Sequence, residues 1–186
     1  APGAWLQVAC NALGPLQRGG TVVGVDIEPF DLPDRKIDKR VLPPVVADAL
    51  ELARRPGRLA EVCGVRTFDA VLSDMAPKTS GDKFRDSARS EALVHAAIDV
   101  ALGRSAGAGG GGPGPPSLQG VLKTGGSMCL KLLEGPGSDR RELEAVLKPL
   151  FKRVAFARPK ATRKESREVY VVALGRLPGG ASRAQR

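Results

Sequence analysis

This sequence is short of histidine, of paired cysteines and of long apolar runs. No apolar stretch approaches the roughly 20 residues that a helix needs to cross a bilayer, so we expect no contact with a membrane. There is 1 histidine, and the 3 cysteines are far apart with no C-x-x-C pair. A zinc site is therefore improbable, and we expect no bound metal. An odd number of cysteines also argues against a disulfide framework and fits a reducing compartment best.

An initiator methionine and a signal peptide are missing as well. The chain starts Ala1-Pro2-Gly3-Ala4-Trp5, with no basic segment ahead of an apolar core. The sequence therefore reads as the remainder of a longer one, and it gives no direct indication of targeting.

Acidic residues are outnumbered by basic ones, and aromatic residues are scarce. The formal net charge is +9, and only 4% of the residues are aromatic. Such an excess of positive charge favours a polyanionic partner, most often nucleic acid. A basic surface that serves only solubility is the alternative reading.

Helical and strand patterns alternate along the chain, which indicates one α/β domain. Helices are expected near 2–13, 49–63 with a break at Pro56-Gly57, 87–102 and 139–151, and strands near 21–25, 41–47, 67–73, 127–133, 154–157 and 169–174. The prediction is a mostly parallel sheet with helices on both faces, as in Rossmann-like folds. The domain would cover 1–175, with a flexible Gly/Pro-rich insert at 103–118 and a disordered basic tail at 176–186.

Three charged residues stand at or inside segments that otherwise read as buried strands: Asp74, Lys131 and Glu168. A charge in such a place is costly unless it is paired or used. Three of them suggest one shared polar site at an edge of the sheet. A buried ion-pair network without function is the alternative.

A second group of residues suits a nucleoside cofactor. Ligands of open parallel sheets bind beyond the carboxyl ends of the strands. Gly3 would let a ligand approach the backbone, Asp26 suits a ribose diol, and Asp48 could accept from an adenine amino group. A helix cap is the plain alternative for Asp26. The turn lacks the further glycines of nicotinamide-binding proteins, and Trp5 would crowd a pyrophosphate, so S-adenosylmethionine fits better.

Several of these motifs together resemble the FtsJ-type RNA ribose 2′-O-methyltransferases. They are Ala-Pro-Gly-Ala-Trp at the start, Gly24-Val25-Asp26, Ser73-Asp74-Met75-Ala76-Pro77, Gly125-Gly126-Ser127 through Lys131, and Ser166-Arg167-Glu168-Val169-Tyr170. Order and spacing match over nearly the whole chain. The resemblance implies the class I S-adenosylmethionine-dependent methyltransferase fold. It is strongest to the bacterial and organellar branch acting on large-subunit rRNA, and implies methylation of a uridine ribose.

The resemblance also assigns roles to residues. The family uses a Lys-Asp-Lys-Glu tetrad, and Asp74, Lys131 and Glu168 match its last three positions. The first lysine and the central strand before the cofactor turn would precede Ala1. Lys131 would be the base, and Asp74 would also lie near the cofactor. A lysine ammonium must lose a proton before it can accept one. Either Lys131 is neutral when the substrate binds, or it only orients the hydroxyl.

The resemblance leaves partners and compartment less defined. We expect a monomer that binds large-subunit rRNA or a ribosomal particle, in an organelle such as the mitochondrion if the source is eukaryotic and in the cytoplasm if it is bacterial. A non-catalytic rRNA-binding or ribosome-assembly protein remains the alternative, and a tRNA 2′-O-methyltransferase a weaker one. Basic residues near the predicted site are candidates for phosphate contacts: Lys78, Arg158, Lys160, Arg163, Lys164 and Arg167.

Overall fold

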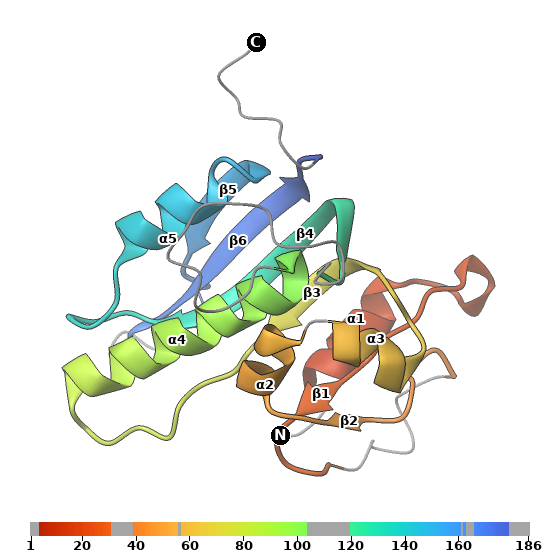
Figure 1. Ribbon diagram of the computed structural model, residues 1–186, viewed down its shortest axis with the longest axis horizontal. Helices are drawn as coiled ribbons and strands as arrows, with labels where there is room; N and C mark the ends of the chain where they lie inside the picture. The colour runs from red at the N-terminus through yellow and green to blue at the C-terminus, as the bar shows by residue number, and fades with distance from the viewer. Residues whose placement is uncertain are drawn as a thin grey trace.

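The structure is a computed structural model that describes residues 4–30, 39–55, 57–103, 120–160, 162 and 166–178. Within these residues, the strands form a two-stranded sheet, β1-β2, and a four-stranded sheet in the order β3-β4-β6-β5 (Figure 1). Their bounds are β1 Val25–Asp26, β2 Val45–Val46, β3 Phe68–Ser73, β4 Leu122–Leu133, β5 Phe151–Ala157 and β6 Glu168–Arg176. β1 pairs with β2 and β3 with β4 in parallel, whereas β6 runs antiparallel to both of its neighbours.

Aspartates mark where three of the helices begin. The helices are α1 Ala4–Ala12, α2 Ala49–Arg54, α3 Gly57–Cys63, α4 Lys83–Leu102 and α5 Arg140–Leu147, with a 3-10 turn at Leu16–Arg18. The side chains of Asp48, Asp82 and Asp139 accept hydrogen bonds from backbone N–H groups in the first turns of α2, α4 and α5. Such caps satisfy donors that the helix itself leaves unpaired. α4 ends at Gly103, whose φ of 79° lies in the left-handed region that glycine adopts at low cost.

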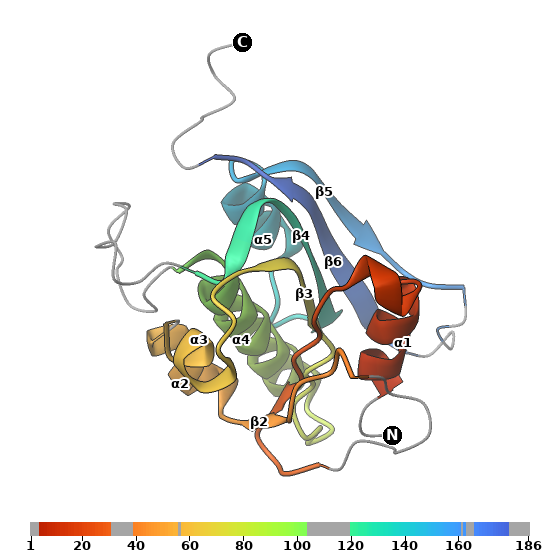
Figure 2. The same ribbon diagram turned by 90° about the vertical axis from the view of Figure 1, so that its right-hand side faces the viewer.

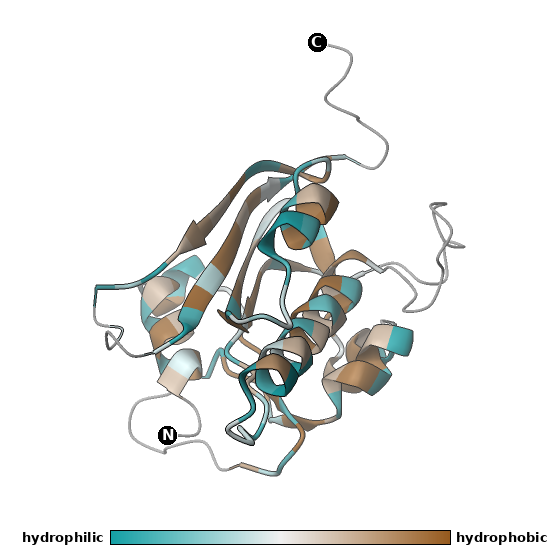
Figure 3. Cartoon of the chain, turned by 90° about the vertical axis from the view of Figure 1, so that its left-hand side faces the viewer, coloured by the Kyte–Doolittle hydropathy of each residue, from teal (hydrophilic) through white to brown (hydrophobic). Residues whose placement is uncertain are grey.

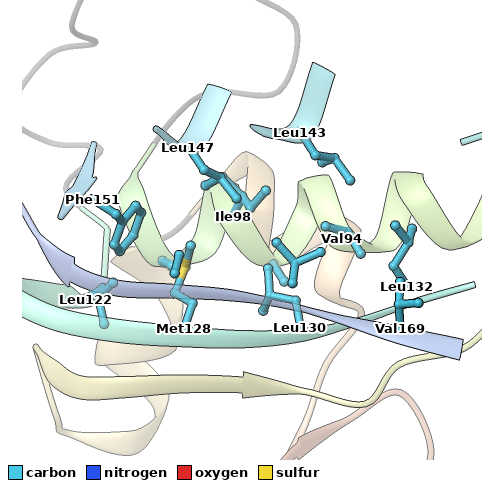
Figure 4. Close-up of a cluster of buried hydrophobic side chains, with 14 residues drawn as sticks. Val94, Ile98, Leu122, Met128, Leu130, Leu132, Leu143, Leu147, Phe151 and Val169 are labelled. Atoms are coloured by element: carbon cyan, nitrogen blue, oxygen red, sulfur yellow. The ribbon is translucent and has the colours of Figure 1, made fainter. Parts of the chain in front are cut away.

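Helices lie on both faces of the four-stranded sheet. α4 and α5 cover one face and α1 lies against the other (Figure 2). Figure 3 shows hydrophobic and hydrophilic residues alternating around α4 and α5, as expected for helices with one buried side. The core between these helices and the sheet joins α4, α5, β4 and β6 (Figure 4), through residues that include Val94, Ile98, Leu130, Leu132, Leu143, Leu147 and Val171. A second cluster packs α2 and α3 against the opposite side of α4.

The two sheets are separated by a gap between β1 and β3. No ladder joins these strands in the described residues. A cavity of about 490 Å³ lies there, with walls that include Val23 and Val25 on one side and Phe68, Ala70 and Leu72 on the other. Leu72 is 47% exposed, unusual for an apolar residue near the middle of an α/β fold.

The predicted α/β architecture is confirmed, with several differences in detail. The sheet is mixed rather than mostly parallel, because β5 and β6 form an antiparallel pair and β6 inserts next to β4. β6 continues to Arg176, and the Leu177 N–H donates to the Leu150 carbonyl, so ordered structure passes the boundary predicted at 175. The helix predicted over 49–63 is divided as expected, since α2 ends at Arg54 and α3 begins at Gly57. Most of the predicted insert and the end of the tail lie outside the described residues.

Candidate active site

Three of the aspartates predicted to meet at the cofactor site line one cavity. Asp26 ends β1, Asp48 follows β2, and Asp74 follows β3. All three contribute to the walls of a cavity of about 620 Å³, whose other walls include apolar residues of β3 and α4 such as Val71 and Ala97. The carboxyl ends of parallel strands point to the same edge, which explains how residues far apart in sequence meet here.

Local contacts differ among these aspartates. The Asp26 Oδ1 accepts from the Glu28 N–H at 3.0 Å, which is a turn contact and not a helix cap. Asp48 is the cap: its Oδ1 accepts from the Leu50 N–H at 2.8 Å, at the start of α2. Asp74 is exposed on the loop beyond β3. Gly3, also predicted at this site, lies outside the described residues.

Lys131 and Glu168 project from the same face of the sheet. Lys131 pairs with Tyr170 across β4 and β6, and Leu133 pairs with Glu168. Lys131 alternates with the buried Leu130 and Leu132, so it points away from the α4 side of the sheet. Glu168 lies diagonally across the ladder from Lys131, within reach of a long side chain.

Tyr170 lies between these groups and is a residue that the sequence analysis passed over. Its ring stacks on Trp5 of α1, with ring centroids 6.0 Å apart and an angle of 26° between the rings. Burial raises the pKa of the Tyr170 phenol, and Glu168, Cys129 and Asp74, which are negative when ionised, raise it further. The phenol therefore stays protonated at neutral pH and can donate a hydrogen bond. Its position two residues after Glu168 in a strand is the signal that could have identified it.

Lys131, Asp74 and Glu168 are not neutralised by one another. In the described part of the chain, no ion pair or hydrogen bond joins the side chains of these three residues. A static buried ion-pair network, the alternative left open by the sequence, would require such contacts. The arrangement instead places Lys131 and Glu168 on the face of the sheet that carries Tyr170, with Asp74 within electrostatic range of the phenol.

The basic residues that were predicted to contact RNA phosphates lie in different environments. Lys78 and Lys160 are exposed. The Arg167 Nη1 donates to the Lys83 carbonyl at 3.3 Å and to the Glu134 carbonyl at 3.2 Å, so this guanidinium ties loops together. Arg158 donates to the carbonyl of Ser166. Arg163 and Lys164 lie outside the described residues.

No helix within the described ranges is long and apolar enough to span a membrane. The same ranges contain no cluster of three or more His, Cys, Asp or Glu side chains that could hold a metal ion.

The chain matches a known protein family. The family model for FtsJ-like methyltransferases matches residues 1–176. The chain therefore belongs to the FtsJ-like methyltransferase family.

Two relatives show which kind of methyltransferase the chain resembles. The chain is similar to ribosomal RNA large subunit methyltransferase E of Desulfatibacillum aliphaticivorans, with 35% identity covering 96% of this chain and 72% of the relative. It is 37% identical to the protein of the same name from Myxococcus xanthus, covering 95% of this chain and 70% of the relative.

A solved structure supports the fold. The crystal structure of a putative ribosomal RNA methyltransferase from Plasmodium falciparum superimposes with a TM-score of 0.68 and 21% identity, covering 95% of this chain and 82% of that one. At this identity the likeness concerns the fold alone. It confirms the Rossmann-like arrangement expected from the alternation of helices and strands.

Proposed function

We propose that this protein transfers a methyl group from S-adenosylmethionine to a ribose 2′-hydroxyl of RNA, and that the target is a uridine of large-subunit rRNA. Family membership and the names of the relatives support the class of reaction and of substrate. The observation that carries the proposal is the shared face of Lys131, Tyr170 and Glu168, on which Trp5 stacks against Tyr170. Trp5 in turn lines the cavity of about 490 Å³ together with Asp26 and Asp74.

The residues present fit S-adenosylmethionine. When bound, this cofactor supplies a methyl group on a sulfonium centre that is open to attack by a nucleophile. Asp26 would accept from the ribose hydroxyls and Asp48 from the adenine amino group, although the cap of α2 already uses one oxygen of Asp48. Trp5, which lines the cavity of about 490 Å³ together with Asp26 and Asp74, would contact the cofactor from α1, and Asp74 would lie near the positive sulfonium. Carboxylates and apolar walls suit a cationic nucleoside better than an anionic pyrophosphate.

Lys131 would be the base that accepts the proton of the reacting hydroxyl. Its amine lies on the same face as the Tyr170 phenol and the Glu168 carboxylate, which can hold it in place by hydrogen bonds once substrate is bound. The protonated phenol of Tyr170 would donate to a carboxylate of the site. Holding the hydroxyl in line with the methyl donor is the other contribution of these residues.

The direct test is the position of the methyl group on the product. The protein is incubated with radiolabelled S-adenosylmethionine and unmodified large-subunit rRNA, and the product is digested to nucleosides. Label in 2′-O-methyluridine is the expected result. Label on a base would contradict ribose chemistry. RNA binding without any methyl transfer would favour the non-catalytic alternative.

A further inference from the structure

An exposed phenylalanine stands at the start of α4, the helix that follows the loop after Asp74. Phe84 is 61% exposed and is flanked by Lys83 and Arg85, which are also exposed. An aromatic ring between two cationic side chains is typical of sites that bind single-stranded nucleic acid, because the ring stacks on a base and the cations contact phosphates. Scattered exposed apolar residues are common, so exposure alone decides little.

The backbone that carries Phe84 is unusually well fixed. Its N–H donates to the Asp82 Oδ1 at 2.9 Å, and its carbonyl accepts from the Ser87 hydroxyl at 3.1 Å. The preceding carbonyl, that of Lys83, accepts from Arg167 at 3.3 Å and from the same Ser87 hydroxyl at 2.7 Å. The ring is therefore displayed from a rigid support, which lowers the entropy cost of binding a ligand on it.

A buried carboxylate anchors the loop that leads to this support. Asp86 is 1% exposed, and its Oδ1 accepts from the N–H and the hydroxyl of Ser80, both at 2.8 Å. Its Oδ2 accepts from the Gly81 N–H at 3.2 Å. Burying a charge is costly unless it is fully bonded, so this anchor holds the loop between Asp74 and α4 in one conformation.

The backbone that carries Phe84 is linked to the candidate active site in two ways. Ser80 is six residues after Asp74, at most about 20 Å along an extended chain. Arg167 contacts the carbonyl next to Phe84 and directly precedes Glu168 in sequence. The backbone that carries the ring is therefore bonded to the segment that leads into Glu168, and nucleotides next to a ribose bound at the site could reach this ring.

We propose that Phe84 is a stacking platform for a base of the RNA substrate, with Lys83 and Arg85 contacting the adjoining phosphates. This inference rests on the proposed function, since it names how that site holds its RNA. Stacking uses the face of a base, so the platform accepts any of the four bases. Selection of a particular RNA sequence would have to come from other contacts.

The test compares variants of Phe84 in binding of a fluorescently labelled rRNA fragment by anisotropy. Phe84→Ala is expected to weaken binding about tenfold, within the range for loss of one stacked base, and Phe84→Tyr to bind like wild type. Phe84→Leu, which keeps an apolar side chain without a ring, is expected to behave like Phe84→Ala. The RNA KM should rise in the same order, while kcat at saturating RNA stays unchanged.

Matched controls separate stacking from misfolding and from the loss of exposed apolar surface in general. Val62 of α3 is 58% exposed and precedes the amino end of β3, so Val62→Ala should bind RNA like wild type. S-adenosylmethionine affinity should be unchanged in all variants. Wild-type RNA binding by Phe84→Ala or by Phe84→Leu would overturn the inference. Failure of the proposed function alone looks different: RNA binding would depend on Phe84 in a protein that methylates no RNA.

Discussion

Lys131 and Tyr170 face each other directly across β4 and β6, on the side of the sheet where Trp5 stacks on the tyrosine ring. This relationship connects the helix next to the predicted cofactor site with the strand that carries the proposed base. Burial is the largest cause of the raised pKa of Tyr170, and the charges of Glu168 and Asp74 raise it further. The Tyr170 phenol therefore lies within electrostatic range of both carboxylates that are assigned to the reaction.

Asp26 provides the first prediction. Asp26→Ala is expected to weaken S-adenosylmethionine binding by about 1.5–3 kcal/mol, the range for losing hydrogen bonds to a charged group. Isothermal calorimetry measures this directly. Glu61→Ala on α3, which removes an exposed carboxylate outside the cavity, is the control and should bind like wild type. Tight NADH binding without S-adenosylmethionine binding would show that the cofactor is misassigned.

Much of this site could be predicted from sequence because strand ends carry strong local signals. Asp74 and Asp26 each follow a short β-branched or apolar run, and parallel topology then places them at one edge. Tyr170 was missed because its importance depends on pairing with Lys131, a contact between residues far apart in sequence.

Other features escaped prediction because tertiary contacts or a cap decide them. Arg167 remains a predicted phosphate ligand, and the sequence does not show that its Nη1 also donates to two backbone carbonyls. The start of α4 at Lys83, four residues before the predicted start, follows from the Asp82 cap. The antiparallel insertion of β6 has no local signature either.

Asp86 gives a prediction about stability and pH. Its hydrogen bonds to Ser80 and Gly81, with Arg167 nearby, lower the pKa of the carboxyl below its usual value against the opposing effect of burial. A lowered folded-state pKa means that the contribution is complete above the unfolded pKa of about 3.9, and is lost as pH falls through the folded-state pKa. Asp86→Asn should therefore destabilise the protein at pH 7, and by less below about pH 4.

Urea unfolding at several pH values measures this effect. Asp69→Asn is a suitable control, because Asp69 pairs with Lys123 at the surface and should contribute little at any pH. A difference between wild type and Asp86→Asn that stays constant from pH 7 to about pH 3 would contradict the linkage.

The gap between β1 and β3 predicts a pattern of hydrogen exchange. Backbone amides of β4 and β6 are paired on both sides of each strand, whereas β3 pairs only with β4 in the described residues. Amides of β1 and of the open edge of β3 should exchange much faster than those of Leu130 and Val171. Mass spectrometry of exchanged peptides gives the comparison. Equal protection of β3 and β4 would mean that the open edge is covered in solution.

Lys160 and Arg167 should respond differently to substitution. Lys160→Ala is expected to reduce the salt dependence of RNA binding by a slope of about 0.7–0.9 for one lost phosphate contact. Arg167→Ala should instead lower stability, because two loop carbonyls lose their donor. Arg66→Ala, at an exposed site before the amino end of β3, is the control for charge alone. An unchanged salt slope for Lys160→Ala would assign that lysine to solubility.

The most direct test of the central claim is single-turnover methyl transfer by Lys131→Ala, measured together with its S-adenosylmethionine affinity. The amine is proposed to act on the ribose hydroxyl and not on the cofactor. The rate should therefore fall by about 10²–10⁴, the usual contribution of a general acid–base group, while cofactor affinity stays near that of wild type. A wild-type rate in this variant would remove Lys131 from the mechanism and contradict the account.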